Sequence, residues 1–292
     1  MSAGRPDRPP LLQHPPLSLR LRQRFERWPP VVGIRHRKRV READAFLLSF
    51  PKTGRTWLRT MIADLMAAHY RQPDIAERAM HPRIEGAPGV PRIVVRHDGN
   101  PHKARPQDIV PHRAEYRGCR VMLLVRDPRD AIVSNYFQVT RRDHWFEGDL
   151  AAYLKWSRGS LDSMLRYYDV WARQRQVPAD LLLVRYEDLR RDPVAGLRDI
   201  AGFLGLGGVA EAAIARAVEA SSFEAMRRRE TARDADASPL AAGSAEDPES
   251  FKTRKGKVGG YRDYLDDAQV AWLDARVASM DPWYGYGKVS SG

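Results

Sequence analysis

The stretch that decides the fold reads Phe46-Leu47-Leu48-Ser49-Phe50-Pro51-Lys52-Thr53-Gly54-Arg55-Thr56-Trp57-Leu58. An apolar run ends in a short polar turn, and a helical pattern of apolar residues begins directly after it. This order of strand, turn and helix directs backbone N–H groups and a helix N-terminus at whatever lies in the turn. The turn is therefore predicted to hold an anion, most often a phosphate. It is not a Walker A loop, because Gly-x-x-x-x-Gly-Lys-[Ser/Thr] is absent and Lys52 precedes Gly54.

Short apolar segments alternate with amphipathic helical patterns from residue 45 onward. Strands are predicted over residues 45–49, 92–95, 120–125 and 181–184. Helices are predicted after the first strand, from Pro128 with Asp127 as N-cap, and over residues 159–173, 193–204, 210–219 and 267–279. Buried strands that alternate with helices favour a single α/β domain, with a central parallel sheet, helices on both faces and a P-loop-like strand-turn-helix. Ligands bind such sheets at the carboxyl ends of the strands.

The net charge of +12 over 292 residues favours polyanionic partners, such as nucleic acid, anionic lipid, acidic polysaccharide or a multiply phosphorylated cofactor. The arginines are spread along the whole chain, so charge alone decides little. The sequence has no apolar run of membrane-spanning length and no secretory h-region at its start. Cys119 is the only cysteine, which excludes an intrachain disulfide and favours a reducing compartment. We therefore expect a cytoplasmic protein.

Residues 1–44 alternate arginine with proline and lack a sustained apolar face. Such a segment is typical of a solvated arm, although it could also contact a membrane surface or an acidic partner. The folded domain is expected to occupy residues 45–289. Residues 230–250 are rich in Ala, Asp, Ser and Pro without periodicity, which indicates a loop or lid over the site.

Two further segments carry groups suited to anions. Arg126 directly follows the strand at 120–125, and Ser134 comes eight residues later, two turns into the next helix. An arginine fork and a hydroxyl donor there indicate a second phosphate site. The late segment reads Phe251-Lys252-Thr253-Arg254-Lys255-Gly256-Lys257-Val258-Gly259-Gly260-Tyr261, a basic turn whose glycines permit close backbone approach to a ligand.

Together these segments resemble sulfotransferases that use 3′-phosphoadenylyl sulfate (PAPS), of the cytosolic type also found in bacteria. The turn that begins with Lys52 resembles their phosphosulfate loop, and Arg126 with Ser134 resembles their 3′-phosphate motif R-x-P-x-D-x-x-x-S. The late segment is similar to R-K-G-x-x-G-D-W, with Gly260 and Tyr261 in place of Asp and Trp. Residues 184–189 and 221–226 resemble two weaker family segments that border the adenine.

The resemblance implies PAPS as sulfuryl donor, adenosine 3′,5′-bisphosphate (PAP) as product and no metal. It implies catalytic roles for Lys52 at the leaving phosphate, for His97 as general base and for Ser134, which restrains Lys52 when no acceptor is bound. The implied cofactor-binding residues are Lys52, Thr53, Gly54, Arg55, Thr56, Trp57, Arg126, Ser134, Tyr186, Ser221, Phe223, Met226, Arg254, Lys255 and Gly256. Trp57 could also stack on the purine.

The expected reaction moves the sulfuryl group to a hydroxyl or amine of a small molecule, lipid or carbohydrate. Residues 140–157 and 230–250 are expected to shape the acceptor pocket. Two alternatives remain open: a P-loop-like kinase, and a basic module that binds nucleic acid or an anionic surface. The first lacks the expected Gly-Lys-[Ser/Thr], and the second would show affinity that falls steeply with salt. We expect no nucleic acid partner, and the sequence leaves the oligomeric state open.

Overall fold

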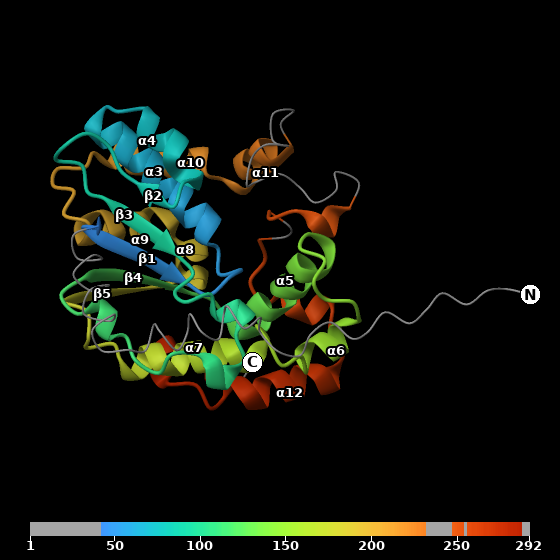
Figure 1. Cartoon of the computed structure of the whole chain (residues 1–292). Coiled ribbons are helices and arrows are strands. Elements are labelled where there is room, and N and C mark those ends of the chain that lie inside the picture. The colour runs from blue at the N-terminus through green and yellow to red at the C-terminus, as the bar shows by residue number, and fades with distance from the viewer. Residues whose placement is uncertain (1–41, 232–246, 254–255, 288–292) are drawn as a thin grey trace, which may run out of the picture.

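The computed structural model describes residues 42–231, 247–253 and 256–287. Its centre is a five-stranded sheet in the order β2-β3-β1-β4-β5 (Figure 1). Strands β1 (Ala45–Ser49), β3 (Ile93–Arg96), β4 (Arg120–Val125) and β5 (Asp180–Arg185) pair in parallel, whereas β2 (Arg83–Ile84) is antiparallel to β3. The predicted α/β domain with a mostly parallel sheet is confirmed. The two-residue edge strand β2 was not predicted, because it is too short to show any period.

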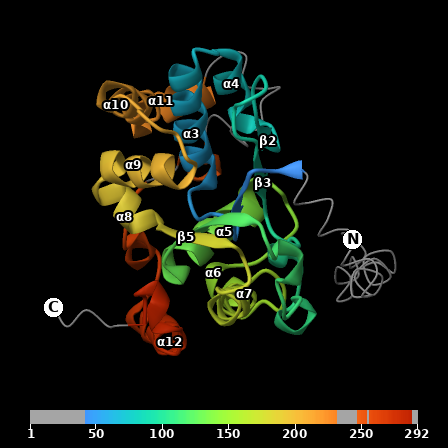
Figure 2. The same cartoon turned by 90° about the vertical axis from the view of Figure 1, so that its left-hand side faces the viewer.

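Helices cover both faces of the sheet, as Figures 1 and 2 show from two directions. The helices are α3 (Arg55–Tyr70), α4 (Asp74–Glu77), α5 (Pro128–Arg141), α6 (Leu150–Leu154), α7 (Leu161–Arg173), α8 (Tyr186–Arg191), α9 (Pro193–Phe203), α10 (Glu211–Ala220), α11 (Phe223–Thr231) and α12 (Asp267–Val277). Helices α3, α9 and α10 pack on one face, and α7 with the segment after α12 packs on the other. Helix α5 with α6 and α12 forms a third cluster beside the sheet.

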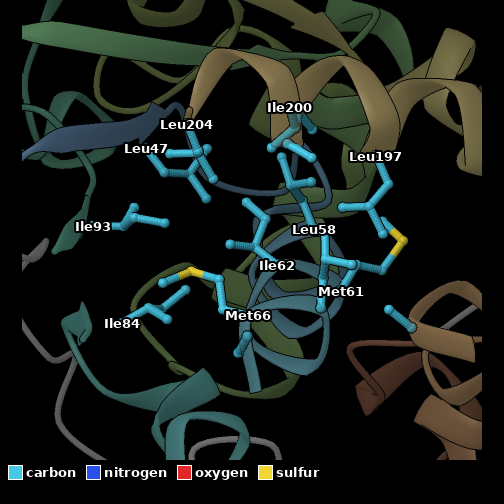
Figure 3. Close-up of a cluster of buried hydrophobic side chains, with 14 of the residues drawn as sticks. Leu47, Leu58, Met61, Ile62, Met66, Ile84, Ile93, Leu197, Ile200 and Leu204 are labelled. Carbon is cyan, nitrogen blue, oxygen red and sulfur yellow. The ribbon is translucent and has the colours of Figure 1, made fainter. Parts of the chain in front are cut away.

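Strand β1 is buried on both faces, which explains why its sequence is a nearly continuous apolar run. Its side chains alternate between faces, so Leu47 enters the core under α3 and α9 while Phe46 and Leu48 enter the core on the α7 side. Figure 3 shows Leu47 beside Leu204, which directly follows α9, in one cluster with Leu58 and Ile62 of α3. Fully burying one such side chain stabilises the fold by roughly 1.5–3 kcal/mol. A strand buried on both faces has no polar side to show.

The carboxyl ends of the parallel strands lie at one edge of the sheet. The chain leaves β1 toward Lys52, β3 toward His97, β4 toward Arg126 and β5 toward Tyr186. Asp127 caps α5 as predicted, because its carboxylate accepts a hydrogen bond of 2.9 Å from the Arg129 N–H. This edge therefore carries the turns that the sequence singled out.

Several predictions fall on residues outside the described ranges. They concern the arm over residues 1–41, the middle of the proposed lid at 232–246, and the cofactor contacts of Arg254 and Lys255. Along the described part of the chain, no helix is both long enough and apolar enough to cross a membrane.

Candidate functional site

The turn after β1 has a backbone that only a few conformations allow. Lys52 has a φ of 66° and Gly54 a φ of 91°, both in the left-handed region. A non-glycine residue held there costs of order 1–3 kcal/mol, and such residues concentrate at functional sites. A Cβ on Gly54 would also lie 2.5 Å from the Tyr186 ring, so no larger residue fits. Helix α3 begins directly after this glycine, which points its N-terminus across the turn.

A cavity of about 310 Å³ opens at this edge of the sheet. Most of the predicted site residues line it, namely Lys52, Gly54, Arg55, Thr56, Trp57, His97, Arg126, Ser134, Tyr186, Phe223, Met226 and Gly256. Two predicted residues lie behind its wall. Thr53 is fully buried and its hydroxyl donates to the Phe50 carbonyl at 2.9 Å, while Ser221 is buried beneath Trp57. Their side chains hold the site in shape rather than face a ligand.

Arg126 connects the two turns across the cavity. Its guanidinium donates 3.2 Å hydrogen bonds to the Lys52 and Lys257 carbonyls and forms a 3.6 Å ion pair with Asp130. It also lies 4.4 Å from the centre of the Tyr186 ring. Its Nε is buried and makes no hydrogen bond within the described ranges. The turns after β1 and β4 therefore share one cation, with donor capacity left for an anion.

An aromatic wall stands beside these cations. The Trp57 indole N–H donates to the Ser221 carbonyl at 2.8 Å, which fixes the ring, and the Tyr186 ring meets it edge-on at 5.9 Å. The Arg190 guanidinium lies 5.4 Å from the Trp57 ring centre and lines the cavity. The sequence analysis missed Arg190, although it stands one helical turn after Tyr186 and so shares its face of α8.

The late glycine turn is fastened to α5 by one buried carboxylate. Asp130 accepts hydrogen bonds from the Gly259 N–H at 2.8 Å and from the Tyr261 N–H at 2.9 Å. Tyr261 is buried, and the guanidinium groups of Arg129 and Arg262 lie 5.3 and 5.0 Å from its ring centre. The tyrosine thus keeps an aromatic packing position where the related motif has tryptophan.

A stripe on α5 faces the cavity. Asp130, Ser134 and Gln138 are spaced four residues apart and all line it. The Lys52 ammonium donates to the Gln138 side-chain oxygen at 3.0 Å, and the Gln138 amide donates to Asp143 at 3.0 Å. The sequence analysis missed Gln138, although the helical period from Ser134 points to it. This chain of hydrogen bonds holds the Lys52 head group against α5.

His97 lies at the end of β3 with one ring nitrogen fixed. Its Nδ1 is 3.1 Å from the Ser49 carbonyl oxygen, which can only accept a hydrogen bond, so we assign the proton to Nδ1. Nε2 is then an acceptor. Burial, followed by the charge of Arg55 and the proximity of His102 and Lys52, holds the His97 pKa well below its ordinary 6.5. The ring is thus neutral at physiological pH and able to take a proton.

A second histidine and two further basic side chains line the cavity together with His97. The His102 ring centre is 5.2 Å from His97 and 6.0 Å from Trp145, a residue that is 38% exposed. Arg55 and Lys252 also line the cavity, and the charge of Arg55 acts on His97, His102 and Lys252. Burial, with Arg142 nearby, lowers the pKa of Lys252 to about 8.

Glu230 fixes the segment that carries Lys252. Its buried carboxylate accepts hydrogen bonds from the Lys252 N–H and from the Thr253 N–H, the latter at 2.9 Å, and from the Thr253 hydroxyl. Arg142 of the segment after α5 lies 3.9 Å from the same carboxylate and donates to the Ser250 carbonyl at 2.7 Å. The end of α11 and residues 250–253 are therefore joined through one side chain.

Comparison with known proteins relates this arrangement to sulfuryl transfer. The family model described as the sulfotransferase domain matches residues 42–280. Cytosolic sulfotransferase 17 of Arabidopsis thaliana is 28% identical over 293 residues, an alignment that covers 90% of this chain and 82% of that protein. Human sulfotransferase 6B1 is 26% identical and covers 81% of this chain and 76% of its own length. A crystal structure of a mouse sulfotransferase complexed with PAP superposes with a TM-score of 0.54 at 21% identity, covering 81% and 84% of the two chains.

Proposed function

The chain belongs to the sulfotransferase family, and from that membership we propose how its residues divide the work of sulfuryl transfer. The family takes its sulfuryl group from PAPS and leaves PAP. The observation that supports this proposal most directly is that Lys52 and Arg126 line the same cavity. The Arg126 guanidinium donates a hydrogen bond to the Lys52 carbonyl, which joins the turn after β4 to the turn after β1. Family membership also decides against the kinase and against a module that only binds nucleic acid or anionic surfaces.

The residues present fit an adenine nucleotide with phosphates at two positions. Arg126, with its buried Nε, and Ser134 would hold the 3′-phosphate, and the late glycine turn would close beside them. The backbone of residues 53–56 and the N-terminus of α3 would hold the 5′-phosphate. Trp57, Tyr186, Phe223 and Met226 supply apolar and aromatic surface for the base. Arg254 and Lys255 are proposed as further donors on the resemblance alone.

Bound PAPS supplies a sulfuryl group whose bond to the bridging phosphate oxygen breaks as its bond to the acceptor oxygen forms. Lys52 stabilises the negative charge that develops on the leaving phosphate, because its ammonium is fixed in the cavity through Gln138. His97 Nε2 takes the proton of the acceptor hydroxyl. Ser134, on the same stripe of α5 as Gln138, offers its hydroxyl to the 3′-phosphate and restrains Lys52 when no acceptor is bound.

The primary test is calorimetry with PAP and with adenosine 5′-monophosphate. We expect Arg126→Ala to weaken PAP binding by at least tenfold, because hydrogen bonds to a charged group contribute roughly 1.5–3 kcal/mol each. The 5′-monophosphate lacks the 3′-phosphate, so its weaker binding should change by less than about threefold. Arg198→Gln is the matched control, since Arg198 pairs with Glu211 on the surface and does not line the cavity. Unchanged PAP affinity in Arg126→Ala would remove the second phosphate site.

We further propose that the catalytic domain spans residues 45–289 and that the protein works in the cytoplasm. The family match over residues 42–280 supports the first proposal, and relatives named as cytosolic sulfotransferases support the second. The acceptor is a hydroxyl or amine compound, and the family alone does not say which.

A further inference from the structure

Arg55 is a cation of the cavity wall that the proposed contacts with the nucleotide do not use through its side chain. Arg55 opens α3, so its backbone N–H belongs to the turn that would hold the 5′-phosphate. Its guanidinium lines the cavity yet makes no hydrogen bond or ion pair with any residue in the described ranges. An arginine with this many donors is seldom left in a cavity without an acceptor. These donors have no partner among the described residues, and an anion is the ligand that suits them.

The guanidinium of Arg55 lies near the two histidines of the cavity, because its charge acts on both His97 and His102. Arg55 and Lys252 line the cavity with His97 and His102, and the charge of Arg55 lowers the pKa of all three groups. The groups that would bind the nucleotide are instead gathered around Arg126 and Tyr186. The side chain of Arg55 is therefore placed for a ligand that lies beside the histidines.

The surrounding carboxylates are already engaged. Glu230 bonds the Lys252 and Thr253 N–H groups and pairs with Arg142, and Asp143 accepts from Gln138. Burial and the neighbouring Arg59 lower the pKa of Arg55 to about 10, so it remains a cation at neutral pH. A partly buried cation without a counter-charge is costly, and an anionic ligand would offset that cost.

We propose that the sulfate acceptor carries a carboxylate or phosphate group that pairs with Arg55 and Lys252 while its hydroxyl faces His97. This inference rests on the proposed function and adds the chemical class of the acceptor. The His102 ring lines the cavity 5.2 Å from the His97 ring, and this aromatic surface favours an acceptor with an aromatic ring between its two polar ends. The hydroxyl proton passes to His97 Nε2 and the acceptor oxygen gains the sulfur, so the anionic group takes no part in bond exchange.

The test measures acceptor binding to protein saturated with PAP, by calorimetry. The probes are 4-hydroxyphenylacetate with its methyl ester, and 4-hydroxyphenyl phosphate with 4-methoxyphenol. We expect at least one anion to bind at least about tenfold more tightly than its neutral counterpart. Arg55→Gln should remove that preference and Arg55→Lys should restore part of it, while both variants keep PAP affinity within about threefold. Which anion is preferred distinguishes a carboxylate acceptor from a phosphate acceptor.

Arg198→Gln again serves as the matched control and should leave both affinities unchanged, because it removes the same charge from a surface ion pair. Equal binding of anion and neutral probe, absence of anion binding, or a preference that survives Arg55→Gln would overturn the inference. Loss of PAP affinity in Arg55→Gln would also overturn it, because the guanidinium would then serve the cofactor. Failure of the unaltered protein to bind PAP would instead contradict the proposed function.

Discussion

Lys52→Ala is expected to lower the turnover of sulfuryl transfer by about 10²–10³, because the donor aimed at the leaving phosphate is lost. The wild-type ammonium is held 3.0 Å from the Gln138 oxygen, so its contribution depends on a fixed position as well as on charge. Turnover is measured as PAP formed with a saturating acceptor. Lys52→Arg should recover only a part of the rate, since its planar fork cannot reproduce a point charge at the same place.

Two controls separate catalysis from folding in that experiment. The melting temperature of Lys52→Ala should stay close to that of the wild type, and Lys155→Ala should leave turnover unchanged, because Lys155 is exposed and does not line the cavity. A Lys52→Ala variant that keeps more than a tenth of the activity would contradict the assigned role.

His97→Ala is expected to lower kcat by about 10² or more, because the acceptor hydroxyl loses its proton acceptor. His97→Gln is a useful second variant, since its amide can still donate to the Ser49 carbonyl but cannot take a proton. Similar losses in both variants would point to proton transfer, whereas full activity in His97→Gln would assign His97 a structural role. The rate of both variants should recover with acceptors whose hydroxyl is acidic, such as nitrophenols, because these lose their proton without a general base.

The pH profile tests the same residue independently. Protonated His97 cannot act as a base, so kcat/KM should fall on the acid side, and it should do so only well below pH 6.5 because the His97 pKa is depressed. Arg55→Gln removes one of the charges that lower this pKa, so its acid limb should move to higher pH. The profile is measured from about pH 5 to about pH 8 with an uncharged acceptor. A wild-type limb at or above pH 6.5 would contradict the assigned environment.

Sequence reasoning succeeded where a local pattern has one physical meaning. Strands β1 and β4 were predicted with the bounds that the structure gives, because double-sided burial requires a continuous apolar run. Asp127 followed by proline predicted the start of α5, since few residue types can accept a hydrogen bond from the free N–H groups at a helix N-terminus. The roles of the predicted site residues remain predictions.

What the sequence could not show depends on contacts between distant segments. Nothing local says that Thr53 turns its hydroxyl to the Phe50 carbonyl, or that Ser221 serves Trp57 through its backbone. The position of Gln138 on the cavity side of α5 could have been predicted, because it shares a helical stripe with Ser134. Its hydrogen bond to Lys52 could not, because the two residues are 86 positions apart. Arg55 and Lys252 likewise come together only because Glu230 and Arg142 bring residues 250–253 back to the cavity.

The bridge formed by Glu230 has a practical consequence for engineering. Since its carboxylate anchors residues 252–253 directly to the end of α11, the placement of Lys252 does not depend on the length of the chain between them. Closing a longer connection costs little, about 0.6 kcal/mol for each doubling in length. Any change to the sequence between α11 and Lys252 should therefore keep Glu230, so that Lys252 retains its place in the cavity.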